Sequence, residues 1–85
     1  MSDVTVQFFA SLREDLGKDR MSIVLDGSLS VSDLVTKICA AENTAWQNAL
    51  GSPDILVAVN QTLVERTHLV QPGDEVAFLP PVTGG

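Results

Sequence analysis

Apolar and polar residues alternate in two segments near the beginning of the chain, over residues 4–9 and 21–25. A period of two is typical of a β-strand with one buried face. The stretch between these segments is polar and contains Gly17, a residue suited to a turn with positive φ. We therefore predict a hairpin with a long connection. Its inward residues are Val4, Val6 and Phe8 in the first strand and Met21, Ile23 and Leu25 in the second.

A helix is predicted to begin after Ser30. Ser30 is a favourable N-cap residue, and Asp33 stands three residues later in a position like that of a capping box. The stripe of apolar residues that follows at helical spacing indicates a helix packed across the sheet. Its members are Val31, Leu34, Val35, Ile38 and Ala41. A short helical turn around Trp46 is predicted within residues 43–50.

The second half of the chain is predicted to contain three more strands. The strongest turn signal is the sequence Gln-Pro-Gly-Asp at residues 71–74. Strands on both sides of one helix predict an α+β fold with the helix laid across one face of the sheet. The strands are expected at residues 55–59, weakly at 63–65, and at 75–79, with a turn at Asn60-Gln61 between the first two.

Length and charge narrow the classes of function. The chain has 85 residues, and 5 Lys and Arg against 11 Asp and Glu give a net charge of −6. A domain of this size supports one modest core but is marginal for a core together with a deep catalytic cleft. The negative charge disfavours nucleic acid and anionic membranes as partners and favours a protein with a basic surface.

The cysteine content and the apolar runs bear on the compartment. Cys39 is the single cysteine, so an intramolecular disulfide is impossible. The start of the chain lacks the pattern of a secretory signal, and no apolar stretch approaches the roughly 20 residues needed to span a bilayer. We expect a soluble protein of the reducing cytoplasm.

The C-terminal segment is the most informative part of the sequence. Pro80 and Pro81 end the last strand, so we expect one domain at residues 1–79 and an extended tail at residues 80–85. Fully extended, this tail reaches at most ~20 Å. Terminal glycines lack a Cβ and fit a narrow tunnel, and a terminal carboxylate becomes reactive once it is activated, for example as an acyl-adenylate. The glycines on their own are equally compatible with a frayed terminus.

Four segments make the chain similar to a known family: VQFFASLRE, LSVSDLV, VAVNQTLV and PGDEVAFLPPVTGG. With them the chain resembles the small, sulfur-carrying subunits of molybdopterin synthase, which belong to the ubiquitin-like β-grasp proteins. The resemblance implies a mixed sheet, one main helix across one face, and a flexible C-terminal Gly-Gly tail.

The resemblance also implies a role for each residue of the tail. Gly85 is expected to be adenylated and then converted to a thiocarboxylate, which donates sulfur to cyclic pyranopterin monophosphate to build the dithiolene of molybdopterin. AMP and sulfur are then attached to Gly85 only transiently, and neither a bound cofactor nor a metal is expected. The residues expected to thread this end into a partner are Pro80, Pro81, Val82, Thr83 and Gly84.

Three partners are implied by the same resemblance. They are a large catalytic subunit of molybdopterin synthase, an adenylyltransferase related to ubiquitin-activating enzymes that uses ATP, and a sulfur donor of the cysteine desulfurase or rhodanese type. This chain is then a non-catalytic, sulfur-donating subunit. The assembled synthase is expected to be a heterotetramer of two large and two small subunits.

Three other functions remain open at this stage. A sulfur carrier for thiamine synthesis or tRNA thiolation shares the same fold and the same Gly-Gly ending. A ubiquitin-like modifier is instead conjugated to protein lysines. An interaction domain with an inert tail is the third alternative.

Strand parity predicts a docking patch. If Phe8 and Phe78 face the helix, then Phe9 and Leu79 point to the opposite face, and large apolar residues on an open sheet face indicate a contact surface. In the related subunits the positions of Phe9, Leu63 and Leu79 lie at the contact with the large subunit, although an aromatic residue is common at the position of Leu79. Exposure without a partner, or burial by loops, is the alternative.

The remaining candidates favour structural roles. Cys39 on the predicted helix is expected at the edge of the core rather than in a thiol relay. His68 has no neighbouring ligand in sequence, so metal or acid-base work is disfavoured. Adjacent strand residues point to opposite faces, so Asp74-Glu75 is assigned to a turn and the surface. Trp46 is expected to anchor the core, and residues 13–15 to form a solvated loop.

Overall fold

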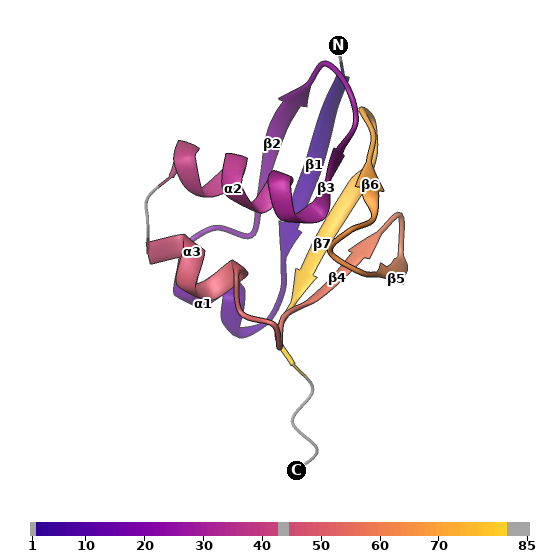
Figure 1. Ribbon diagram of the computed structural model, residues 1–85. Helices are drawn as coiled ribbons and strands as arrows, with labels where there is room; N and C mark the ends of the chain where they lie inside the picture. Colours follow the sequence, from indigo (N-terminus) through magenta and orange to yellow (C-terminus); the bar gives the residue numbers. More distant parts are fainter. Residues whose placement is uncertain (1, 43–44, 82–85) are drawn as a thin grey trace.

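The computed structural model describes residues 2–42 and 45–81, and within them the chain forms seven strands and three helices (Figure 1). None of the helices in this part of the chain is long and apolar enough to cross a membrane. The strands are β1 (Ser2–Phe8), β2 (Arg20–Leu25), β3 (Leu29–Ser30), β4 (Leu56–Val59), β5 (Thr62–Val64), β6 (Leu69–Val70) and β7 (Glu75–Leu79). The helices are α1 (Ser11–Leu16), α2 (Val31–Ala41) and α3 (Ala45–Leu50).

The main sheet has five strands in the order β2-β1-β7-β4-β5. The two central strands, β1 and β7, run parallel, whereas the other neighbouring pairs are antiparallel. A small second sheet joins β3 to β6. The α+β class, the mixed sheet and the single main helix are therefore confirmed, and the first hairpin forms with Val4 opposite Ile23.

The core lies between the main sheet and the helices. Alternate residues of β1 and β7 are completely or almost completely buried, and the apolar stripe of α2 packs against them. The rings of Phe8 and Phe78 stack with centroids 6.0 Å apart, and Trp46 of α3 meets Phe8 edge to face at 5.4 Å. Trp46 is thus a core anchor, as its sequence context predicts. Among the residues that the structure describes, no helix lies over the sheet face that points away from α2 (Figure 1).

Local signals in the sequence fix several ends and turns. The Ser30 hydroxyl accepts a hydrogen bond from the Asp33 amide at 3.1 Å and caps α2. Gly17 ends α1 with a φ of 75°. Asn60 and Gln61 form a two-residue connection between Val59 and Thr62, and both have positive φ angles, as in a type I′ turn.

Two predictions made from local pattern are wrong. The polar connection after β1 contains the helix α1, which buries Leu12, so residues 13–15 are exposed on a helix rather than in a loop. Ala41 was predicted to belong to the buried stripe of α2, but it is exposed. Cys39, next to Ile38, is the buried residue in this last turn. The short sheet of β3 and β6 was not predicted.

The positive φ angles of Gln61 and Gly73 can be tested by substitution. Gln61 has a φ of 71°, which is costly for a residue with a Cβ, so the substitution Gln61→Gly is expected to raise the free energy of unfolding by about 0.5 kcal/mol. Gly73 has a φ of 92°, which is unfavourable for any residue with a Cβ, although no atom would clash with that Cβ. Gly73→Ala is therefore expected to lower the free energy of unfolding by about 1 kcal/mol. Urea titration followed by circular dichroism measures both values. Destabilisation by Gln61→Gly would contradict the turn geometry.

Candidate functional site: an apolar sheet face beside the tail

The face of the main sheet opposite α2 carries apolar side chains from three adjacent strands. Leu56 of β4 is paired in register with Leu79 of β7, and Ala58 lies between Ala77 and Leu63. We call these five residues the open face. Because the partners are in register, their side chains form one continuous apolar surface.

Exposure distinguishes this surface from the core. Leu63 is 64% exposed and Phe9 is 43% exposed, whereas Leu79 is half-buried. Phe9 follows β1 directly, and its amide donates to the carbonyl of Phe78 at 3.2 Å, so it extends the pairing of β1 with β7 by one residue. The outward positions of Phe9 and Leu79 agree with the parity argument, and Leu63, which the family resemblance places at the contact, is exposed as well. The role of these residues at an interface stays a prediction.

The chain leaves the main sheet at one end of the open face. Leu79 is the last residue of β7, and Pro80 and Pro81 follow it outside the strand, half-buried and exposed respectively. A proline lacks the N–H that would continue the ladder, which accounts for this abrupt end. The predicted threading residues Val82, Thr83 and Gly84 and the predicted reactive residue Gly85 lie outside the described residues.

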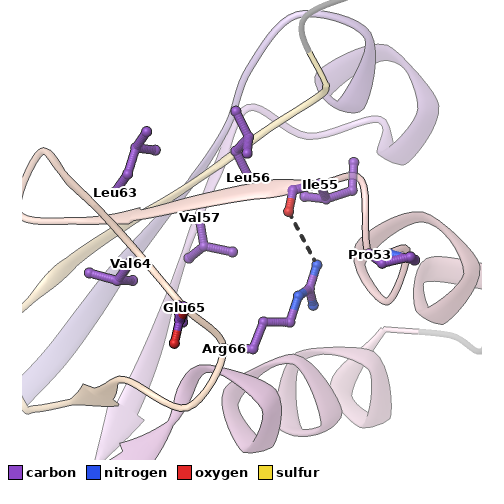
Figure 2. Close-up of a pocket in the computed structure, with 8 residues that line it drawn as sticks. All are labelled: Pro53, Ile55, Leu56, Val57, Leu63, Val64, Glu65 and Arg66. Carbon is purple, nitrogen blue, oxygen red and sulfur yellow. Dashed lines mark hydrogen bonds between the residues drawn. The ribbon is translucent and has the colours of Figure 1, made fainter.

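A pocket of about 420 Å³ opens where β5 separates from the beginning of β4, and sequence reasoning did not find it. Figure 2 shows Leu56 and Leu63 on one side of these strands and Arg66 on the other. The guanidinium of Arg66 donates to the carbonyls of Ser52 at 2.8 Å and Ile55 at 3.5 Å. The loop after β5 places Arg66 beside the pocket. The path of this loop cannot be predicted from the spacing of residues in the sequence.

The other candidate residues have structural roles. Asp74 holds the turn before β7, since its carboxylate accepts from the Gln71 amide at 2.9 Å and from the Asn60 side chain at 3.1 Å. His68 is exposed, and its main-chain carbonyl accepts from the Val31 amide. Over residues 2–42 and 45–81, no three His, Cys, Asp or Glu side chains gather as metal ligands.

The topology and the open face together define a ubiquitin-like β-grasp protein, in which a long helix crosses one face of a mixed sheet and the central strand leads into the C-terminal tail. A model of the ThiS family matches residues 6–85. The chain belongs to the ThiS family.

Two relatives match the chain over nearly its whole length. The chain is 43% identical to the molybdopterin synthase sulfur carrier subunit of Escherichia coli over 82 residues, which span 96% of this chain and 99% of that protein. It is 42% identical, with the same coverage, to the protein of that name from Haemophilus influenzae. Among solved structures, SAMP1 of Haloferax volcanii matches with a TM-score of 0.82 and 27% identity, over 99% of this chain and 100% of that chain.

Cys39 provides a test of the assignment to the core. Its side chain is 6% exposed, and burial raises the pKa of the thiol, so less thiolate forms at neutral pH than at an ordinary cysteine. We expect the folded protein to react with iodoacetamide at pH 7 at least about tenfold more slowly than the urea-unfolded chain. A time course by mass spectrometry measures both rates. Equal rates would indicate an accessible thiolate and would reopen a thiol relay.

Proposed function

We propose that this chain is the sulfur carrier subunit of a molybdopterin synthase, with Gly85 as the residue that bears the sulfur. The proposal is supported by the full-length relatives of that name and by membership of the ThiS family. The structural observation that supports it is the place where β7 ends. β7 ends at Leu79, at the margin of an apolar open face, so a partner bound there receives the tail directly.

The chemistry proposed for Gly85 has two stages. The carboxylate first attacks the α-phosphorus of ATP on an adenylyltransferase, which forms an acyl-adenylate and releases pyrophosphate. The terminal sulfur of a persulfide on a cysteine desulfurase or rhodanese-type donor then attacks the acyl-adenylate and displaces AMP, which forms an acyl disulfide. A thiol reductant cleaves the S–S bond of this acyl disulfide, which leaves the thiocarboxylate on Gly85 and converts the thiol to a disulfide. On the large subunit this group gives its sulfur to cyclic pyranopterin monophosphate.

Because activation consumes ATP, we propose the cytoplasm as the compartment.

The proposed contact with the large subunit is the open face together with Phe9. The open face is apolar on three strands in register, and its exposed leucines, Leu56 and Leu63, supply apolar area for the buried centre that a stable interface requires. Leu63 projects furthest into solvent, and Leu79 lies at the beginning of the tail. This interface fixes the tail relative to the catalytic pocket of the partner. A heterotetramer of two large and two small subunits is the proposed assembly.

The sulfur-carrying role predicts a specific change in mass. After incubation with the adenylyltransferase, ATP and a sulfur donor, the intact mass is expected to rise by the exchange of one oxygen for one sulfur. Deletion of Gly85, or addition of one residue after it, is expected to abolish the change, because the reacting carboxylate is lost or displaced. Circular dichroism checks that both variants remain folded. If the mass of the chain with its natural C-terminus does not change, the proposal is wrong.

The docking role predicts a difference between two exposed leucines. Leu63 of β5 and Leu69 of β6 are 64% and 56% exposed, but Leu63 lies on the open face of the main sheet and Leu69 in the second sheet. Leu63→Ser is expected to weaken binding to the large subunit about tenfold, and Leu69→Ser to leave it within about twofold. Calorimetric titration measures both affinities. Equal effects of the two substitutions would place the interface elsewhere.

A ubiquitin-like modifier is the second candidate, because the likeness to SAMP1 covers nearly the whole of both chains. The small archaeal modifier proteins carry that role in their name. Conjugation to lysines is expected to produce a ladder of larger species in cell extracts that disappears when Gly85 is deleted, whereas a sulfur carrier produces only the mass change of the free chain. Recovery of the large subunit with this chain would likewise exclude a carrier for thiamine synthesis or tRNA thiolation.

A further inference from the structure

The pocket beside β5 combines apolar walls with a single cationic group. Its lining comes from the loop before β4, from β4 and β5, and from the segment that follows β5. Leu56 and Leu63 belong both to this pocket and to the open face, so the two surfaces are continuous. A partner that covers Leu63 therefore reaches the margin of the pocket. The lining residues are Pro53, Ile55, Leu56, Val57, Leu63, Val64, Glu65 and Arg66 (Figure 2).

Arg66 is held in place at both of its ends. Its main-chain carbonyl accepts from the amide of Ser32 in the first turn of α2 at 3.1 Å. One terminal nitrogen, Nη2, donates to the carbonyls of Ser52 and Ile55. The side chain is partly buried. Its conformational freedom is therefore already lost before any ligand arrives, and this lowers the entropic cost of binding one.

The guanidinium nevertheless lacks an acidic partner in the described part of the chain. A guanidinium has five N–H donors, and Nη2 supplies only two of them, so three remain on Nε and Nη1. No described residue accepts from those three, and the only ion pair among described side chains joins Lys18 to Glu42. Glu65 precedes Arg66 in sequence and Asp54 precedes Ile55, whose carbonyl Arg66 contacts, but neither carboxylate pairs with Arg66. A fixed, partly desolvated cation without a counter-charge is a recognition element for an anion.

We propose that Arg66 receives a carboxylate side chain of the large subunit, and that this contact helps to select the partner and to fix its orientation. The inference rests on the proposed function, since it deepens the docking interface described above. A carboxylate matches a guanidinium fork with two parallel hydrogen bonds and carries a single charge. Apolar walls on Leu56, Leu63 and Val64 require apolar groups beside that carboxylate on the partner.

A carboxylate is favoured over a phosphate group by the surrounding charge. Glu65 lines the same pocket, and the whole chain has a net charge of −6. A dianion is repelled by both, whereas one carboxylate is balanced by Arg66. The net negative charge of the chain attracts basic proteins in general. A partner that also places a carboxylate against Arg66 is therefore distinguished from basic proteins that lack one.

Two substitutions that remove the same charge provide the test. Arg66→Gln and Lys37→Gln each remove one positive charge, but Lys37 is exposed on α2 and does not line the pocket. Affinity for the purified large subunit is measured by calorimetry at about 50 mM and about 500 mM NaCl, where screening differs strongly. Leu63→Ser and the unmodified chain are titrated in parallel. Thermal unfolding of each variant shows that it is folded at the temperature of the titration.

We expect Arg66→Gln to bind about tenfold more weakly than the unmodified chain at low salt, with a smaller difference at high salt, and Lys37→Gln to bind within about twofold. If Arg66→Gln binds normally while Leu63→Ser binds weakly, this inference is overturned and the proposed function stands. A loss of equal size at both salt concentrations also overturns it, because Arg66 then acts only by shaping the segment that leads into the beginning of β4. If the unmodified chain does not bind the large subunit at all, the proposed function fails as well.

Discussion

The parallel pairing of β1 with β7 is the constraint on which the rest of the structure depends. It brings segments from the two ends of the chain together at the centre of the sheet, with Val6 opposite Val76 and Phe8 opposite Phe78. All four side chains are buried, and the two phenyl rings stack. A slip of one residue in this register would turn the inward residues of β7 outward, and so the packing of the core fixes the register.

The same register determines what the open face presents. Since Phe78 points inward, Leu79 points outward, and its pairing with Leu56 places two leucines side by side where the strand ends. The open face is thus a direct consequence of strand parity once the core has been formed. Over residues 2–42 and 45–81, helices pack on only one side of the sheet, so the apolar groups on the other side have no helix over them. A domain of 85 residues can in this way combine a packed core with an apolar surface on the opposite side of the same sheet.

How much the sequence predicts depends on whether a feature is local. The alternation in β1 and β2, the Ser30 cap and the turn at Asn60 are set by near neighbours, and all of them are found in the structure. The helix α1 was missed because its six residues are mostly polar, and it is stabilised by the burial of Leu12 in the core.

Features that depend on distant segments were not accessible to pattern analysis. The strands β3 and β6 have two residues each, which is too short to show a period, and they form because the loop before α2 meets a segment some forty positions later. The mixed sheet was expected only through the family resemblance. For the candidate site, parity correctly predicted the outward positions of Phe9 and Leu79, whereas the pocket at Arg66 depends on the path of a loop.

The end of β7 must satisfy two opposing requirements, and its sequence meets both. The strand is held by β1 and β4 up to its last residues, through the Phe9 amide on one side and Leu56 on the other, so the starting point of the tail is fixed. Two prolines follow, and because neither has an N–H to donate, the ladder ends at Leu79. From this point six residues reach at most ~20 Å. Any partner that reacts with Gly85 while it covers the open face must therefore place its reaction centre within that distance of Leu79. Under the proposed function, this geometric limit applies to the reaction centre of the large subunit.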